Sequence, residues 1–187
     1  MSFSPALPGA FSRFSIPMSD DFPLRPFLPA DAMALRDLFA QSIDELTADE
    51  YDEDQRIAWA ATAEDGNEFR ARLGAMLTLV VHLDGEYLGF GSLKDNKTID
   101  MLYVHPDFAG EGVGSALADA LERIAQARGA DAVTVDASDT AVRFFEGRGY
   151  TAVRRNSVPL DDQWLSNTTM IKPLAANTPK ASPAKSS

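Results

Sequence analysis

The sequence of 187 residues contains no cysteine and only two histidines, His82 and His105. The absence of cysteine excludes a disulfide framework, a thiolate metal site and a cysteine nucleophile. Two histidines are too few for a histidine-rich metal site, so we expect no bound metal. No apolar run approaches the roughly 20 residues that span a bilayer, because charges or prolines interrupt every candidate. We therefore expect no membrane partner.

Basic residues are scarce as well, since 17 lysines and arginines stand against 28 aspartates and glutamates, for a net charge of -11. Phosphates demand a basic footprint, so this balance argues against a nucleic-acid partner, whereas a cationic small molecule would be attracted. The chain has the length and composition of a single globular domain. We expect it to be cytoplasmic, and the sequence leaves open whether it forms a homodimer.

Composition changes near both ends of the chain. Residues 1–18 are rich in Ser, Pro and Phe and do not fit a cleavable secretory signal, so we interpret them as a flexible leader. Met18 is an alternative natural start, because the regular pattern begins just after it. Residues 175–187 are mostly Ala, Ser, Pro and Lys and are predicted to be a disordered tail. The folded domain is expected over residues 19–174.

Hydrophobic periodicity predicts a mixed order of elements between these segments. We expect helices over residues 30–40, 52–62, 68–73, 113–128 and 139–146. We expect strands over residues 22–25, 77–83, 87–93, 98–104, 133–136, 150–158 and 168–171. Mixed strands with helices on the faces predict an α/β (α+β) sheet domain.

The glycine-rich turn Gly110-Glu111-Gly112-Val113-Gly114 is the most informative local feature. Glycines let the backbone approach a ligand, and a helix start carries partial positive charge, so the turn suits a pyrophosphate. A tight turn that merely needs glycine is an equal alternative. Ser115 follows with no lysine, which excludes a nucleotide P-loop, and it also stands where a dinucleotide-binding fingerprint needs its third glycine.

The residues around the turn make it more specific. Leu102-Tyr103-Val104-His105-Pro106 precede it, and Ser138-x-x-Ala141-x-x-Phe144-Phe145-x-x-x-Gly149-Tyr150 follow the next strand. With these motifs, residues 24–174 resemble the GNAT superfamily of acyl-CoA-dependent N-acetyltransferases, and more narrowly an uncharacterised bacterial branch of it. The resemblance implies a mostly antiparallel sheet, helices on both faces and a splayed central strand pair that admits pantetheine. It also implies an enzyme that uses acetyl-CoA as co-substrate to acetylate an amine.

The resemblance further implies the coenzyme contacts. Backbone amides near Leu102 and Val104 would hold the acyl carbonyl and the pantetheine arm, and the amides of the turn would bind the pyrophosphate. The predicted contacts are Leu102, Tyr103, Val104, Ala109, Gly110, Glu111, Gly112, Val113, Gly114, Ser115, Ser138, Ala141, Phe144 and Phe145. Two departures matter. Ala109 stands where Arg or Gln is usual, and Glu111 adds an anion beside the phosphates unless it points into solvent.

Ser138 and Phe145 occupy positions where many family members carry Asn and a Tyr that protonates the leaving thiolate. The usual acid is absent, so a non-catalytic acyl-CoA-binding or interaction module is the alternative function. A thiol with a pKa of about 8.5 is nevertheless a tolerable leaving group, and alignment plus an oxyanion contact from the Leu102 amide can supply much of the rate. Asp100, on the same face as Leu102, is predicted to be the base that deprotonates the amine, or alternatively a solvent-exposed carboxylate.

The acceptor site is expected between the first two strands. Seven carboxylates lie in the stretch from Asp44 to Asp54, and Tyr51, Gln55 and Trp59 recur at helical spacing. Together they would make an acidic, aromatic-lined mouth for a cationic primary amine of a small molecule or peptide. The alternative is that these acids only stabilise the start of a helix. Asn167 is a further candidate for the acceptor site, or a turn residue.

Overall fold

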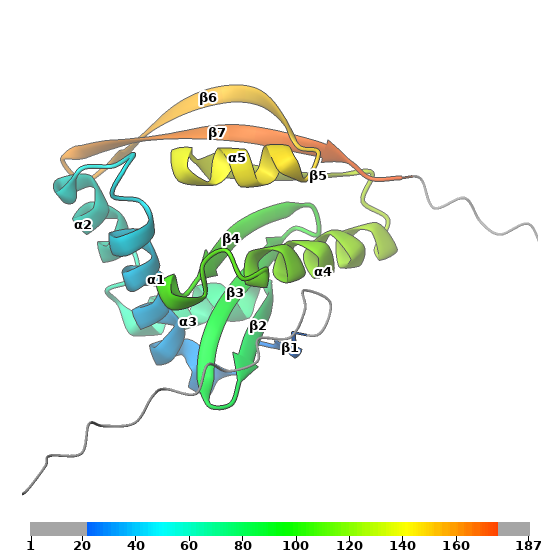
Figure 1. The fold of residues 1–187 in the computed structure, drawn as a ribbon, viewed down its shortest axis with the longest axis horizontal. Helices are drawn as coiled ribbons and strands as arrows, with labels where there is room; N and C mark the ends of the chain where they lie inside the picture. Colours follow the sequence, from blue (N-terminus) through cyan, green and yellow to red (C-terminus); the bar gives the residue numbers. More distant parts are fainter. Residues whose placement is uncertain (1–21, 176–187) are drawn as a thin grey trace, which may run out of the picture.

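Figure 1 shows the computed structural model, which describes residues 22–175. The leader predicted over residues 1–18 lies outside this range, as does the predicted tail except for Ala175. Residues 22–175 form one seven-stranded sheet of order β1-β2-β3-β4-β5-β7-β6. Every neighbouring pair is antiparallel except β4 and β5, which are parallel. The predicted mixed, mostly antiparallel α/β sheet is confirmed.

The elements follow the predicted order. The strands are β1 (Leu24–Pro26), β2 (Leu77–Leu83), β3 (Glu86–Lys94), β4 (Thr98–Val104), β5 (Ala132–Ser138), β6 (Thr151–Leu160) and β7 (Gln163–Pro173). The helices are α1 (Ala32–Leu46), α2 (Glu53–Ala61), α3 (Gly66–Ala75), α4 (Val113–Ala127) and α5 (Asp139–Gly147), with short 3-10 turns η1 (Pro29–Asp31) and η2 (Pro106–Phe108). None of these described helices has the length and apolar character needed to cross a membrane.

Helix α1 and strand β7 extend furthest beyond their predicted bounds. Helix α1 continues to Leu46, because Ser42 and Ile43 extend the buried stripe begun by Leu35, Leu38 and Phe39. Strand β7 starts at Gln163 instead of residue 168. Its first residues pair with β6, beginning with Gln163 opposite Leu160, across a turn at Asp161. This pairing depends on contacts between the two strands and not on the hydrophobic pattern within β7, so the sequence did not predict the earlier start.

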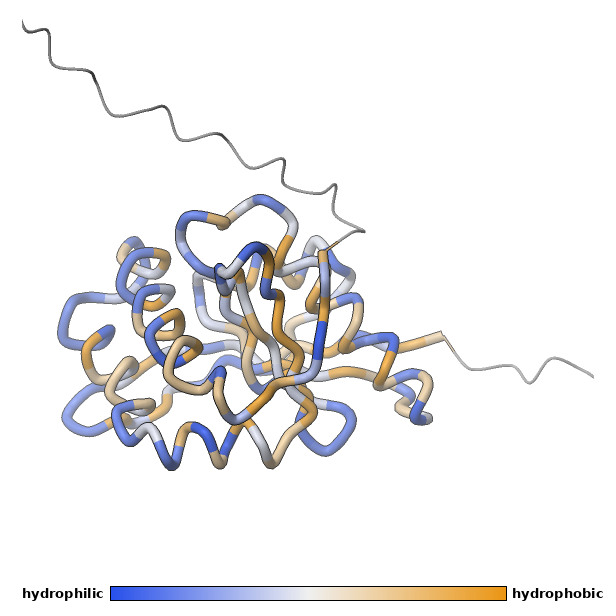
Figure 2. The backbone as a smooth tube through the Cα atoms, turned by 90° about the horizontal axis from the view of Figure 1, so that it is seen from below, coloured by the Kyte–Doolittle hydropathy of each residue, from blue (hydrophilic) through white to orange (hydrophobic). Residues whose placement is uncertain are grey.

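Two hydrophobic cores lie on opposite faces of the sheet. Helices α4 and α5 pack Leu117, Leu121 and Phe145 on one face, together with strand residues such as Val81 and Val135. Helices α1 and α3 cover the other face, where Phe39, Leu73, Val80 and Met101 belong to the second core. Adjacent residues Val80 and Val81 enter different cores because successive strand side chains point to opposite faces. Figure 2 shows the hydrophobic stretches on the central strands, with mostly hydrophilic loops around them.

Strands β4 and β5 separate soon after they meet. They pair only at Thr98 with Thr134 and at Ile99 with Val135. Beyond this point β4 stays with β3 and β5 stays with β7, so the sheet opens like a fork. Asp100 sits at this fork as the extra residue of a β-bulge, since Ile99 opposes Leu93 while Met101 opposes Ser92. The predicted splayed strand pair is therefore confirmed.

The β6–β7 hairpin arches over α5 at the top of Figure 1 and reaches α2 at one end. There the side-chain amide of Gln55 donates to the backbone oxygen of Trp164 over 2.8 Å. The hydroxyl of Tyr51 donates to the backbone oxygen of Ser166 over 2.6 Å. These bonds attach the segment between the first two strands to the beginning of β7.

Candidate active site

A cavity of about 620 Å³ passes through the fork between β4 and β5. On the α4 and α5 side it is lined by the glycine-rich turn and by Phe144 and Phe145, and on the α1 and α2 side by Ser42 and Trp59. All of the predicted coenzyme contacts line this cavity except Glu111 and Val113. The fork thus joins two surfaces on opposite faces of the sheet, so two reactants can meet inside it.

The glycine-rich turn lies at one end of the cavity and opens α4. Gly110 and Gly112 have φ values of +81° and +94°, which L-residues with side chains rarely adopt. The first backbone bond of the helix runs from the Ala116 N–H to the Gly112 carbonyl over 3.0 Å. The N–H groups of residues 113–115 therefore have no acceptor within the helix, and Gly112 provides no side chain to cap them. Open amides at a helix start favour an anion.

Glu111 and Val113 depart from the predicted pattern. The Glu111 side chain is exposed and lies outside the cavity wall, as solvation of its charge requires. Val113 is 1% exposed and belongs to the core between α4 and the sheet, where a Cβ on Gly89 would come within 2.9 Å of it. The Val113 side chain therefore cannot contact a ligand in the cavity, which leaves only its backbone N–H for that role.

The start of α5 forms the wall opposite the turn. Ser138 caps this helix by accepting a hydrogen bond from the Ala141 N–H over 3.3 Å, and both residues line the cavity. Phe145 is 2% exposed, with its ring centroid 5.0 Å from that of Tyr150. Phe145 presents an apolar ring to the cavity, so this position offers no proton to a leaving group.

Asp100 lies on the cavity wall at the fork, as the predicted base should. Its Oδ2 atom accepts a hydrogen bond from Arg72 on α3 over 2.9 Å. This ion pair was not foreseen from the sequence. Asp100 is therefore well placed on the cavity wall, but its carboxylate is already bound to a cation.

Tyr103 lines the cavity from the side of the α1 core. Its ring lies 4.6 Å from that of Phe39 and 5.6 Å from that of Phe90, centroid to centroid. Burial raises the pKa of Tyr103 well above its usual range, and an interaction with Trp59 only partly offsets this. Tyr103 therefore stays protonated, and its ring is part of the aromatic wall.

Among the predicted acceptor residues, only Trp59 reaches the cavity wall. Tyr51 precedes α2 and does not share its face. It is 4% exposed, and its hydroxyl accepts a bond from the Asp139 N–H besides donating to Ser166. Its ring packs edge-on against Trp59, with 5.3 Å between centroids. Tyr51 thus joins α5 to β7 and supports Trp59, and it does not line the cavity.

Gln55 and Asn167 are also occupied by structural bonds. The Gln55 side chain closes a capping box with Asp52 at the start of α2 and binds Trp164. The Asn167 side-chain oxygen accepts from the Asn156 amide over 2.7 Å, and neither Gln55 nor Asn167 lines the cavity. The acids around Asp52 partly serve the helix start, because Asp52 caps it and Glu53 and Asp54 fill its first turn.

Several cavity residues were missed by the sequence analysis: Ser42, Leu46, Thr47, Ile99, Val135, Asp136, Ala137 and Thr140. Those from α1 could not be found, because only packing brings that helix to the fork. Asp136 had a usable signal. It lies two residues before Ser138 on a strand, so the two side chains point to the same face of the sheet.

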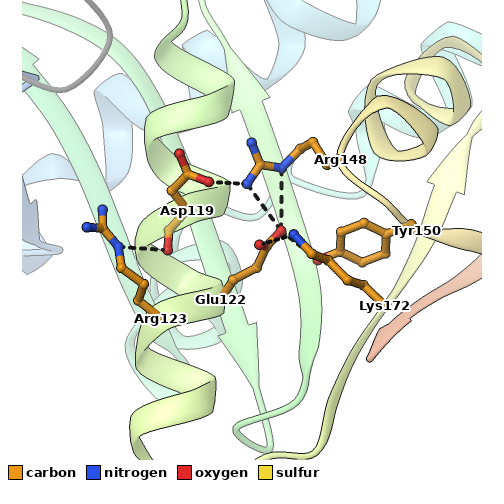
Figure 3. Close-up of polar contacts among 6 residues, drawn as sticks. All are labelled: Asp119, Glu122, Arg123, Arg148, Tyr150 and Lys172. Carbon is orange, nitrogen blue, oxygen red and sulfur yellow. Dashed lines mark hydrogen bonds and ion pairs between the residues drawn. The ribbon is translucent and has the colours of Figure 1, made fainter. Parts of the chain in front are cut away.

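A cluster of charged side chains around Glu122, in the second half of α4, holds the surrounding elements together. Figure 3 shows Arg148, Tyr150 and Lys172 converging on Glu122. The Glu122 carboxylate accepts from Lys172 over 2.6 Å, from Tyr150 over 3.1 Å and from Arg148 over 3.2 Å. Burial and the Glu122 charge raise the pKa of Tyr150, so its hydroxyl remains a donor. The cluster joins α4 to β7 and the end of α5, and its members Glu122 and Lys172 line a separate hollow of about 420 Å³.

Arg148 also pairs with Asp119 and lies over the Phe144 ring, with its guanidinium carbon 5.6 Å from the centroid. These contacts place Arg148 in the cluster. In the described part of the chain, no group of three or more His, Cys, Asp or Glu side chains is arranged to hold a metal ion.

Comparison with known proteins agrees with this geometry. A family model described as "Acetyltransferase (GNAT) domain" matches residues 47–174. The uncharacterised N-acetyltransferase YafP of Escherichia coli K12 is 30% identical over 144 residues, covering 77% of this chain and 91% of its own. A crystal structure from Rhodopseudomonas palustris, described as "GCN5-Related N-acetyltransferase: Aminotransferase, Class-II", is 54% identical, with a TM-score of 0.80, and covers 82% of this chain and 96% of its own.

A more distant structure shares the fold. PaiA N-acetyltransferase from Thermoplasma acidophilum, solved in complex with coenzyme A, is 17% identical, with a TM-score of 0.68 over 82% of this chain and 99% of its own. The forked sheet, the glycine-rich helix start at the fork and the family match lead to the same conclusion: this chain belongs to the GNAT family of acetyltransferases.

Proposed function

We propose that this enzyme transfers the acetyl group of acetyl-CoA to a primary amine of a small molecule or peptide, with a cationic amine preferred. The observation that carries the proposal is the single cavity through the β4–β5 fork. It has open backbone donors at one end and carboxylates on its wall at the other. An anionic coenzyme and a cationic amine are thus favoured at opposite ends, with the reacting atoms between them.

The proposed coenzyme site follows the cavity wall. The pyrophosphate binds to the amides of Gly110, Gly112 and Gly114, and the pantetheine arm lies between β4 and the wall made by Ala141 and Phe144. Two structural relatives support acetyl-CoA as the donor on the shared fold. PaiA holds coenzyme A, and the putative acetyltransferase yncA of Salmonella typhimurium holds acetyl-CoA, at a TM-score of 0.57 to this chain.

At the reacting end, the Leu102 amide is proposed to bind the acetyl carbonyl. Asp100, the base predicted from the sequence, lies beside it on the cavity wall, paired with Arg72. Phe145 provides no acid, so the thiolate leaves without a protein hydroxyl at that position. Catalysis then depends on alignment of the amine with the thioester and on stabilisation of the oxyanion, which are usually the larger contributions.

Two measurements on the purified full-length chain test the proposal. Thermal shift with acetyl-CoA, ATP and NAD identifies the ligand, and we expect stabilisation by acetyl-CoA. Coenzyme release with an alkyl diamine, an aminoglycoside and a lysine-containing peptide identifies the acceptor class. Stabilisation by ATP or NAD alone would refute acetyl-CoA as the donor. Tight acetyl-CoA binding without turnover of any of these amines would refute the reaction and favour a binding module.

A further inference from the structure

Two carboxylates flank the fork on the cavity wall, one from each strand. Asp100 and Asp136 are the next residues after the last β4–β5 pairs, Thr98 with Thr134 and Ile99 with Val135. The Oγ1 atoms of Thr98 and Thr134 lie 2.9 Å apart, so the side chains of this row point to the same face. Both carboxylates line the cavity. The opening of the sheet therefore places a second acid beside the predicted base.

The two acids have different partners. Asp100 is held by the positively charged Arg72. The Oδ1 atom of Asp136 accepts instead from the neutral hydroxyl of Thr169 on β7, over 2.5 Å. Within residues 22–175, no lysine, arginine or histidine forms an ion pair with Asp136. The Asp136 charge is thus not balanced by a resident cation.

A chain of hydrogen bonds holds Asp136 in place. The Asn156 amide of β6 donates to the Thr169 hydroxyl over 2.9 Å, and that hydroxyl donates to Asp136. The Nε atom of Arg154 donates in turn to the Asn156 oxygen over 2.7 Å. Thr169 occupies one oxygen of Asp136, which leaves the Oδ2 atom for a ligand.

The other charged groups around Asp136 form ion pairs with one another, except Arg154, which donates to Asn156. On β4 and α3 these are Asp100 and Arg72, and at the start of α5 Asp139 is paired with Arg155 of β6. Arg154 acts on Asp136 only through two intervening side chains. The Asp136 residue is exposed, so an acceptor and water can both reach it.

We infer that Asp136, and not Asp100, takes the proton from the acceptor ammonium, and that Thr169 is its positioning residue. This inference rests on the proposed acetyl transfer. The ammonium gives one proton to Asp136 and becomes a neutral amine. Its nitrogen then forms a bond to the acetyl carbon, and the C–S bond breaks with its electron pair on sulfur. The second proton lost from nitrogen converts the thiolate to coenzyme A thiol, and Asp136 later releases its proton to water.

Matched substitutions at the two fork positions test the inference. Asp136→Asn keeps an oxygen that can accept from Thr169 but cannot take a proton. We expect it to bind acetyl-CoA within about twofold of wild type by calorimetry and to lower kcat by about 100-fold or more at neutral pH. The rate should recover partly towards about pH 10, where the amine loses its proton unaided. Asp100→Asn should lower kcat less than about 10-fold and leave the pH profile unchanged.

Two substitutions of Thr169 test its positioning role separately. Thr169→Val should shift the pH–rate profile in the direction of Asp136→Asn, and Thr169→Ser should restore the wild-type profile, because serine keeps the donor. A wild-type rate and profile in Asp136→Asn would overturn the inference, as would a loss confined to Asp100→Asn or an equal loss in both. If wild type itself turns over no amine of the panel, the proposed function fails first, and the inference fails with it.

Discussion

At the scale of single residues, the chemistry of this protein depends on side chains that are small or missing. Gly112 leaves the amides at the start of α4 open, and Phe145 removes a proton donor from the cavity wall. The sequence identified both positions, because Gly112 matches the glycine-rich motif and Phe145 stands where many family members carry Tyr. It could not show that Asp100 is paired with Arg72 or that Asp136 lies beside it, since those relations join residues far apart in the chain.

The conformation of Gly112 leads to a prediction about coenzyme binding. Gly112→Leu places a side chain at φ +94° and over the open amides, so we expect loss of measurable acetyl-CoA binding by calorimetry. The backbone strain should cost about 1–2 kcal/mol of stability while the fold survives, as judged by circular dichroism.

Gly85 provides a matched control for that substitution. It has a φ of +91° in the β2–β3 turn, and a Cβ there meets nothing within 4 Å. Gly85→Leu should lose similar stability but keep its affinity for acetyl-CoA. If Gly112→Leu bound acetyl-CoA as tightly as Gly85→Leu does, Gly112 would not be part of the coenzyme site.

At the scale of elements, two buried carboxylates join helices to the sheet. Asp31, which is 3% exposed, ends η1 and accepts from Arg25 of β1 over 2.7 and 2.8 Å and from the Tyr87 hydroxyl of β3 over 2.9 Å. Glu122 joins α4 to β7 and to the end of α5. Each acid therefore links elements that are distant in sequence, so each should contribute to global stability.

Asp31 should make stability depend on pH under acidic conditions. The hydrogen bonds from Arg25 lower the pKa of Asp31 to about 2, against the effect of burial, whereas about 3.9 is expected in the unfolded chain. The unfolded state therefore binds more protons, and stability is lost as the pH falls from about 4 to about 2. The contribution above this window is about 2 kcal/mol.

Urea unfolding of Asp31→Asn checks this expectation. The variant should be less stable than wild type at neutral pH, and the difference should shrink as the pH approaches 2. Asp37→Asn is the control, because Asp37 pairs with Arg36 at 3.5 Å on the surface with 60% of its side chain exposed. A difference for Asp31→Asn that did not change with pH would rule out the titration as its cause.

Glu122 should contribute more to the free energy of unfolding than Asp31 does, because its loss removes a partner from two cations. Glu122→Ala leaves Arg148 and Lys172 in a partly buried site without their shared partner, and we expect a loss of about 3 kcal/mol in the free energy of unfolding. Asp119→Ala removes a half-exposed partner of the same arginine and should cost less than about 1 kcal/mol. Equal losses in urea titrations of the two variants would contradict the central role of Glu122.

At the scale of the whole molecule, the net charge of -11 should attract cationic acceptors over a distance. With acetyl-CoA saturating, kcat/KM for a diamine should fall severalfold when ionic strength rises from about 0.01 M to about 0.15 M, because the screening length shrinks from about 30 Å to about 8 Å. An amino acid of similar length, which is zwitterionic, should change little. Equal salt dependence for both acceptors would show that the overall charge does not select the substrate.

The sequence by itself determined the order of the elements, the glycine-rich turn and the family. Each of these is encoded locally, in hydrophobic periods of about two and 3.6 residues and in motifs that span a few turns of chain. The tertiary structure decided what reaches the cavity. Tyr51, Gln55 and Asn167 form hydrogen bonds to other parts of the fold and do not line the cavity. Asp100 is paired with Arg72, and Asp136 lies at the fork. Strand pairing and helix packing join residues far apart in sequence. They leave no local pattern from which these contacts could be predicted, apart from the position of Asp136 two residues before Ser138 on the same strand.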